Sequence, residues 1–135
     1  MPLLVDTGVL YALADRRDAW HRHVVAYVQE SRQPLLAPVT ILPEVAYLLR
    51  ERIGPEAEHA FVSAIARGEL SVEPLSTRDW TRIDALMATY PFLGLVDATV
   101  LAVAERLKLD TIATTDRRHF HAVRLAHAPA LTLVP

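Results

Sequence analysis

The sequence predicts an α/β fold in which a central, mostly parallel β-sheet is flanked by helices in three layers (α/β/α). Short apolar runs alternate with helical patterns from one end of the chain to the other, as connected parallel strands require. Hydrophobic residues make up 52% of the 135 positions and charged residues 22%, which is typical of a folded domain. No repeat or linker interrupts this pattern, so residues 1–135 are expected to form a single domain.

The first expected strand is the apolar run Leu3–Val5, which ends at Asp6. Helices are expected over Val9–Ala14 and Asp18–Ser31. In the second of them apolar residues recur at helical spacing, and Asp18 is a candidate N-cap.

A second short strand is expected at Leu35–Ala37, between two prolines. A helix then runs from the candidate N-cap Thr40 to about Ile53. Another helix is expected over Pro55–Arg67, because it opens on a proline and is followed by Gly68.

The second half of the chain continues the alternation. Ser76 and Asp79 have the spacing of a capping box, which predicts a helix over Thr77–Thr89. Leu95–Leu107 is apolar on nearly every face and is expected to be a buried helix. The remaining strands are expected at Leu70–Pro74, Thr111–Thr115 and Ala130–Val134.

Composition excludes several classes of function. The chain has 14 Lys+Arg against 16 Asp+Glu, so it does not hold nucleic acid by bulk positive charge. It has no cysteine, which excludes disulfides, zinc ribbons and thiol catalysis. No apolar run approaches the roughly 20 residues of a membrane span, and the N-terminus lacks the pattern of a signal peptide. A cytoplasmic protein with no membrane partner is therefore expected.

Four acidic residues occupy positions where acids are unexpected. Asp6 and Asp116 each end an apolar strand, at the edge where the functional groups of parallel sheets collect. Glu44 and Asp97 fall in the early turns of expected helices, among apolar residues, and can reach the same crevice. Taken singly, the three aspartates can be explained as helix caps and Glu44 as an acid favoured by the helix dipole. The hypothesis of a functional acidic site fails only if these explanations are correct for all four residues.

Several carboxylates that converge without a lysine repel one another, and a hard divalent cation such as Mg²⁺ or Mn²⁺ removes that repulsion. Such ions on a carboxylate cluster are typical of phosphodiester hydrolysis, where they orient water and lower its pKa. With these four acids set aside, 14 basic residues face the other 12 acidic ones. The net charge is therefore compatible with RNA held through a metal ion.

Four segments carry a resemblance to a known family. Val5–Leu10 resembles the opening of a PIN domain, and Pro43–Val45 resembles its second acidic motif. Leu95–Ala98 and Ala113–Phe120 resemble the third and fourth motifs. The match covers almost the whole chain in order, and within the family it is similar to the VapC-type toxins of toxin–antitoxin pairs.

The resemblance implies an Mg²⁺- or Mn²⁺-dependent endoribonuclease toxin that a cognate VapB-type antitoxin neutralises, and a homodimer. It makes Asp6 and Asp97 the surest metal ligands, with Asp116 close by and binding the metal directly or through water. Glu44 would bind metal indirectly or help to activate the attacking water. Hydroxyl groups are expected to hydrogen-bond around these ligands at Thr7 and Thr115.

Further residues are candidates for contact with RNA. Arginine pairs follow the first helix and the last acid, and either can hold phosphates or remain a solvated loop charge. His119 and His121 can flank the site, with a structural role as the alternative. Six aromatic residues are interpreted as core or interface residues rather than as base-stacking residues: Trp20, Tyr27, Tyr47, Phe61, Trp80 and Phe92. The candidate arginines are Arg16, Arg17, Arg117 and Arg118.

An apolar groove is expected where two consecutive helices meet, as a surface for an antitoxin helix or a second copy of the chain. Ordinary core burial is the alternative interpretation. The six residues of this expected groove are Tyr47, Leu48, Leu49, Phe61, Val62 and Ile65.

Two other functions remain as alternatives. One is a non-catalytic PIN-like interaction module, against which the complete set of four acids counts. The other is an Asp-based phosphatase or receiver-type domain. A haloacid-dehalogenase-type phosphatase needs a second acid two residues after Asp6, where this chain has Gly8, and a receiver needs a lysine near the site, whereas Lys108 is the only lysine.

Overall fold

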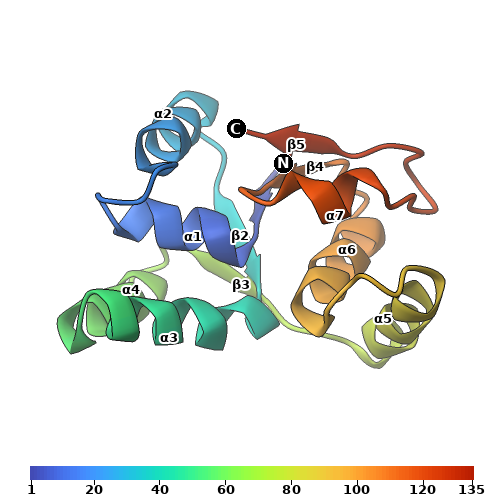
Figure 1. Ribbon diagram of the computed structural model, residues 1–135, viewed down its shortest axis with the longest axis horizontal. Coiled ribbons are helices and arrows are strands. Elements are labelled where there is room, and N and C mark those ends of the chain that lie inside the picture. Colours follow the sequence, from blue (N-terminus) through green and yellow to red (C-terminus); the bar gives the residue numbers. More distant parts are fainter.

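Five parallel strands form one sheet at the centre of the computed structural model, which describes residues 1–135 (Figure 1). The sheet order is β3-β2-β1-β4-β5, and each of its four pairings is parallel. Leu4 of the central strand lies opposite Leu36 on one side and Ile112 on the other. The prediction of an α/β fold around a parallel sheet is confirmed. The strands are β1 (Leu3–Val5), β2 (Leu35–Pro38), β3 (Ser71–Glu73), β4 (Thr111–Ala113) and β5 (Thr132–Val134).

Helices cover both faces of this sheet, which confirms the three-layer arrangement. The chain passes from β1 to β2 to β3 in one direction, then crosses back to β4 and β5 on the other side of β1. Because crossovers are right-handed, this reversal places α1 to α4 on one face and α5 to α7 on the other, as Figure 1 shows. None of these helices has the length and apolar character of a membrane crossing. The helices are α1 (Thr7–Ala14), α2 (His21–Ser31), the 3₁₀ turn η1 (Val39–Ile41), α3 (Leu42–Arg52), α4 (Pro55–Ala66), α5 (Thr77–Thr89), α6 (Leu95–Leu107) and α7 (Arg117–His121).

Two predicted helix starts are wrong. Asp18 closes a turn by accepting a hydrogen bond from the Trp20 amide at 2.8 Å, and α2 begins after it. Thr40 lies inside η1, and its hydroxyl has no hydrogen-bond partner. A cap at Thr40 would need an amide hydrogen two or three residues on. The Leu42 amide already donates to the Val39 carbonyl, and Pro43 has no amide hydrogen.

The predicted capping box is present and holds α5 in place. Ser76 accepts a hydrogen bond from the Asp79 amide at 3.2 Å, and the Asp79 carboxylate accepts one from the Ser76 amide at 2.9 Å. Asp79 is buried, and Arg106 of α6 donates to it at 2.9 Å. The Asp79–Arg106 ion pair joins α5 to α6 and so fixes the helix whose first turn carries Asp97.

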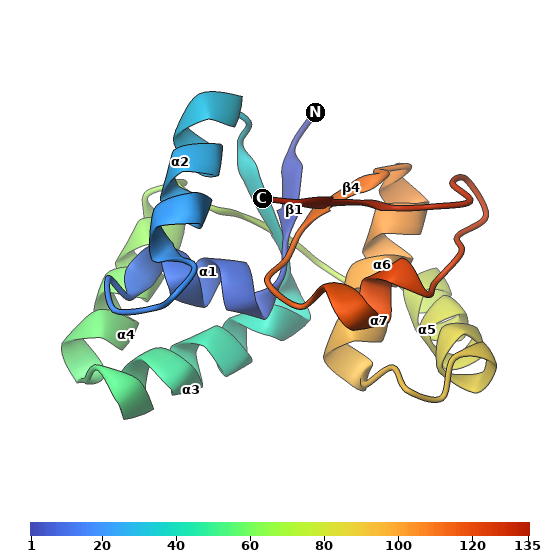
Figure 2. The same cartoon turned by 45° about the horizontal axis from the view of Figure 1, so that its top comes forward.

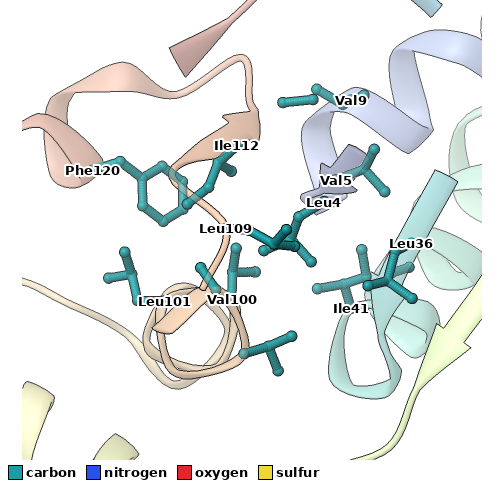
Figure 3. Packing of buried hydrophobic residues seen from close by; sticks show 14 of the residues in the cluster. Leu4, Val5, Val9, Leu36, Ile41, Val100, Leu101, Leu109, Ile112 and Phe120 are labelled. Carbon is teal, nitrogen blue, oxygen red and sulfur yellow. The ribbon is translucent and has the colours of Figure 1, made fainter. Parts of the chain in front are cut away.

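The core lies between the sheet and both helix layers (Figure 3). Phe120 of α7 lies beside Ile112 of β4, near Leu101 of α6, and all three side chains are fully buried. This packing explains α7, a five-residue helix that was not predicted because helices so short are stable only through tertiary contacts. The anchored α7 follows directly on Asp116, so the core also fixes the backbone of that acid.

Candidate active site: an acidic cleft at the strand ends

The four acids meet where the sheet order reverses. Asp6 directly follows β1, and Asp116 lies three residues beyond the end of the neighbouring strand β4. Glu44 and Asp97 lie in the first turns of α3 and α6. In Figure 2 the beginnings of α1 and α3 face those of α6 and α7. One cleft of about 500 Å³ is lined by all four acids, together with Thr7, Gly8, Leu48, Gly94, Leu95, Val96 and Thr115.

Asp6 forms the buried floor of this cleft, with 6% of the residue exposed. One carboxylate oxygen accepts a hydrogen bond from the Val9 amide at 3.0 Å, so Asp6 also caps α1. The other oxygen accepts a hydrogen bond from the Thr114 hydroxyl. Burial, with smaller contributions from the charges of Asp97 and Asp116, raises the pKa of Asp6 to about 6, although the two hydrogen bonds lower it. Asp6 is therefore both the N-cap of α1 and a residue of the acidic cleft.

Thr114 is a site residue that the sequence did not reveal. It is fully buried, and besides donating to Asp6 it accepts a hydrogen bond from the Asp116 amide at 3.0 Å. Successive side chains of an extended segment point to opposite sides, so only one member of the Thr114–Thr115 pair can face Asp6. Nothing in two adjacent threonines says which one it is.

The two predicted hydroxyl residues line the cleft in other ways. The Thr7 hydroxyl is buried and has no hydrogen-bond partner in the protein. Thr115 crosses directly over α1, so that a Cβ built on Gly8 would lie 2.2 Å from the Thr115 hydroxyl oxygen. A side chain at residue 8, where a haloacid-dehalogenase-type phosphatase would need its second acid, therefore requires the Thr115 side chain to move.

The charge of the cleft is not compensated by a strong base. None of the four acids forms an ion pair with lysine or arginine, and no lysine or arginine lines the cleft. The one basic neighbour is His119 of α7, whose Nδ1 lies 3.3 Å from the Asp97 carboxylate. Lys108 caps the opposite end of α6, far along the helix from Asp97, and so does not serve as the lysine of a receiver.

The donor set of the cleft fits a hydrated divalent cation. No three acidic or histidine side chains stand close enough together to ligate one ion directly. Mg²⁺ keeps several of its waters and commonly takes only one or two carboxylates, so direct convergence of three is not required. Asp6 uses two of its roughly four acceptor positions, and the unpartnered Thr7 hydroxyl can bond a water of the ion.

The predicted RNA-contacting arginines lie outside this cleft. Arg16 and Arg17 follow the C-terminal end of α1, where they line a separate hollow of about 380 Å³ with Arg52 of α3. Arg117 donates a hydrogen bond to the carbonyl oxygen of Pro135. Arg118 is exposed on α7.

The six residues of the expected apolar groove do not form one surface, so that prediction is wrong. Leu49 is fully buried in the core, while Leu48 lines the acidic cleft. Tyr47 and Val62 are exposed. Helical geometry separates them, because consecutive residues of a helix face different directions. An apolar hollow of about 320 Å³ lies instead between α1 and α4, lined by Leu10, Leu13, Ala14, Leu35, Phe61, Ala64, Glu69 and Leu70.

The sequence and the fold are similar to those of known proteins. The chain is 27% identical to Ribonuclease VapC26 of Mycobacterium tuberculosis over an alignment that covers 98% of this chain and 100% of the relative. Its fold is similar to that of VapC20 from Mycobacterium tuberculosis, a sarcin–ricin loop cleaving toxin, with a TM-score of 0.79, 23% identity and coverage of 94% of this chain and 98% of that one. A toxin–antitoxin complex from Klebsiella pneumoniae gives a TM-score of 0.73 at 21% identity, covering 90% and 92% of the two chains. The PIN domain family model matches residues 3–125, and the chain therefore belongs to the PIN domain family.

Proposed function

We propose that this protein is a divalent-metal-dependent endoribonuclease toxin of the VapC type. The observation that carries the proposal is the single cleft lined by Asp6, Glu44, Asp97 and Asp116 without any lysine or arginine. The similarity to a ribonuclease over the whole chain supports RNA as the substrate. Membership of the PIN domain family supports the same reaction class.

In this proposal Asp6, Asp97 and Asp116 hold an Mg²⁺ or Mn²⁺ ion, directly or through water. The bound ion supplies a water of lowered pKa and neutralises negative charge on the phosphate. Hydrogen bonds from Val9 and Thr114 keep the Asp6 carboxylate fixed against the floor of the cleft. Such positioning matters because a ligand that need not reorient loses less free energy on binding.

Glu44 has a different role from the three aspartates. It is exposed in the first turn of α3 and lies in the same cleft. We assign it to the attacking water: the water oxygen bonds to phosphorus as the bond to the leaving oxygen breaks, and Glu44 accepts the proton that the water loses. Replacing it should lower kcat more than it lowers metal affinity.

The test is cleavage of total RNA by the purified protein in Mg²⁺. Asp97→Asn is expected to reduce the cleavage rate by more than about 100-fold, above the usual cost of changing a residue that only supports a ligand. EDTA is expected to stop cleavage and Mn²⁺ to restore it. Asp84→Asn, an exposed acid on α5 outside the cleft, serves as the matched control and should cleave like the parent.

Three results would contradict this function. Cleavage by Asp97→Asn at the parent's rate would remove the site, and cleavage that survives EDTA would point to a histidine-based ribonuclease. RNA binding without cleavage under all metal conditions would favour the non-catalytic interaction module instead.

We propose that the apolar hollow between α1 and α4 receives a helix of a VapB-type antitoxin. Seven of its eight lining residues are hydrophobic, and Phe61 lies in it. A structural neighbour described as a toxin–antitoxin complex supports this kind of partner. Co-expression with the antitoxin tests it: Phe61→Asp should weaken co-purification while cleavage of RNA persists.

A homodimer is expected to use a different surface. Tyr47 on α3 is 62% exposed and Val62 on α4, the helix that packs against α3, is 52% exposed, so a second copy that covered either would bury apolar area. Analytical ultracentrifugation of the parent and of Tyr47→Glu would check this. The parent should sediment as a dimer and the variant as a monomer.

A further inference from the structure

Three aromatic rings form a row at the rim of the acidic cleft, on the loop between α5 and α6 and on α7. The Tyr90 and Phe92 rings lie 5.9 Å apart edge to face, and the Phe92 and His119 rings lie 5.4 Å apart at 40°. The position of Tyr90 is fixed by a hydrogen bond, which its hydroxyl accepts from the Arg124 amide at 3.1 Å. The row is therefore fixed at one end by the loop that follows α7.

Phe92 is exposed although the loop that carries it is packed. Phe92 is 44% exposed, whereas the next residue, Leu93, is 3% exposed and supplies the apolar contact to the core. The loop therefore does not need Phe92 for burial. A large ring left in water costs free energy that a binding partner can recover.

The row is continuous with the cleft. The His119 side chain is 36% exposed, and its Nδ1 lies 3.3 Å from the Asp97 carboxylate, which lines the cleft. Leu95, which also lines the cleft, is 45% exposed and follows Phe92 by three residues. A strand whose phosphate lies at the acids therefore has its neighbouring base within reach of the rings.

We propose that Phe92 and His119 form a stacking platform for an unpaired nucleobase next to the phosphate held at the acidic cleft. The proposal rests on the ribonuclease function proposed above and names the form of its substrate. Aromatic faces stack on bases that are free of a duplex, and such stacking tolerates every base. An acidic or apolar peptide fits this position less well, because the row of rings contacts the Asp97 carboxylate of the acidic cleft. A phosphate can approach these carboxylates together with a metal ion.

Direct measurement of binding separates this proposal from catalysis. The probe is a fluorescent oligoadenylate of about twelve nucleotides, compared with an abasic strand of the same length, in Mg²⁺ and in the Glu44→Gln background. Glu44→Gln slows cleavage, and it leaves the three aspartates and the Asp97–His119 contact in place. The variants to compare are Phe92→Leu, Phe92→Trp and the control Trp80→Ala, which removes a ring that is 50% exposed on α5 outside the cleft.

Stacking predicts that Phe92→Leu raises the Kd for oligoadenylate about tenfold and leaves the Kd for the abasic strand unchanged. Phe92→Trp should bind oligoadenylate at least as well as the parent, and Trp80→Ala should bind like the parent. Thermal melting of Phe92→Leu is expected to match the parent, since Leu93 and not Phe92 packs on the core.

The proposal is overturned if Phe92→Leu keeps the parent's affinity for oligoadenylate, or if it weakens both strands equally. It is also overturned if the parent does not distinguish oligoadenylate from the abasic strand. The two proposals fail separately. A protein that never cleaves RNA but loses base discrimination in Phe92→Leu retains the platform without the nuclease, and one that cleaves RNA with no effect of Phe92→Leu retains the nuclease without the platform.

Discussion

The Thr114 hydroxyl donates a hydrogen bond to the Asp6 carboxylate across the join between β4 and β1, linking two residues 108 positions apart in the chain. The same hydroxyl oxygen accepts a hydrogen bond from the Asp116 amide at 3.0 Å. A single buried side chain thus sets the orientation of one acid and the backbone of another. It also opposes the rise in the pKa of Asp6 that burial causes.

Replacing Thr114 with valine should disturb the site while preserving its shape. The variant loses the hydrogen bond that lowers the pKa of Asp6, so this pKa should rise above its value of about 6. Because a metal ligand must be ionised, the acid limb of the pH–activity profile should move to higher pH. The profile of cleavage rate in Mg²⁺ between about pH 5 and 9 measures the shift.

Thr99→Val is the matched control for this prediction. Thr99 is also fully buried, but its hydroxyl donates to the Leu95 carbonyl at 2.7 Å and not to a carboxylate. The control should lose some stability and keep the parent's pH profile. An identical profile in Thr114→Val and the parent would show that the hydroxyl does not tune Asp6.

Without metal, the free energy of unfolding should depend on pH through Asp6. The pKa of this carboxyl is raised from 3.8 to about 6 by burial, so the native state binds the proton more tightly than the unfolded chain. Ionisation of the Asp6 carboxyl therefore lowers the free energy of unfolding. Stability should fall as the pH rises from about 4 to 6 and stay lower above that, by up to about 3 kcal/mol.

Urea unfolding in EDTA checks this pH dependence. Asp6→Asn should be more stable than the parent at pH 8 and lose that advantage toward pH 4, while Asp84→Asn should follow the parent throughout. Mg²⁺ should stabilise the parent at pH 8 and not Asp6→Asn, since binding to the native state adds to stability. An advantage of Asp6→Asn that is the same at every pH would contradict the raised pKa.

The alternation of strands and helices predicted the fold, because the pattern of apolar residues in the sequence shows which segments are buried. The short apolar runs at Leu3–Val5 and Leu35–Ala37 became central strands, and the capping box at Ser76 began α5 as predicted. The start of α3 was wrong, because Thr40 lies in the 3₁₀ turn η1, in which the Leu42 amide donates to the Val39 carbonyl. The five-residue α7 was missed, because its stability comes from Phe120 in the core.

The acids of the site were predictable for a related reason. A strand-end acid such as Asp6, or a lone acid in an apolar helix such as Asp97, stands out against its neighbours in the sequence. The residues around these acids, which orient them or are proposed to contact the substrate, do not stand out. Thr114 is one of two adjacent threonines, and Phe92 resembles any loop aromatic until its exposure is known. Contacts between residues far apart in the chain decide these roles, and a local pattern does not contain them.

Gly8 should be intolerant of alanine only while Thr115 is present. A Cβ at residue 8 would lie 2.2 Å from the Thr115 hydroxyl oxygen but 3.5 Å from the Thr115 Cβ. Gly8→Ala is therefore expected to cost roughly 1–3 kcal/mol in the parent. In a Thr115→Ala background it should be neutral or stabilise by up to about 1 kcal/mol, because alanine favours the helix that begins at Thr7.

A double-mutant cycle by urea unfolding measures this coupling between residues 8 and 115. The expected coupling is favourable to the double variant by about 1–3 kcal/mol. Additive effects would show that Gly8 is required by its backbone and not by the approach of Thr115. Gly94→Ala is the control, since a Cβ there meets no atom within 4 Å and should show no coupling to Thr115→Ala.

Arg16 and Arg17 should contribute to RNA binding through charge and not through the chemistry of cleavage. They line a hollow with Arg52 at the end of α1 opposite to Asp6, and none of the three forms an ion pair. Each phosphate that such a side chain neutralises adds about 0.7 to the slope of log Kd against log salt for single-stranded RNA. Arg16→Gln and Arg17→Gln should each lower that slope by about this amount and raise KM at low salt, with kcat unchanged.

Arg67→Gln provides the comparison, because Arg67 is exposed but already paired with Glu69 at 2.6 Å and should leave the slope as it is. Equal slopes in all three variants and the parent would place the RNA path elsewhere, whereas a selective loss in the first two would extend the path from the acidic cleft along α1 to the hollow.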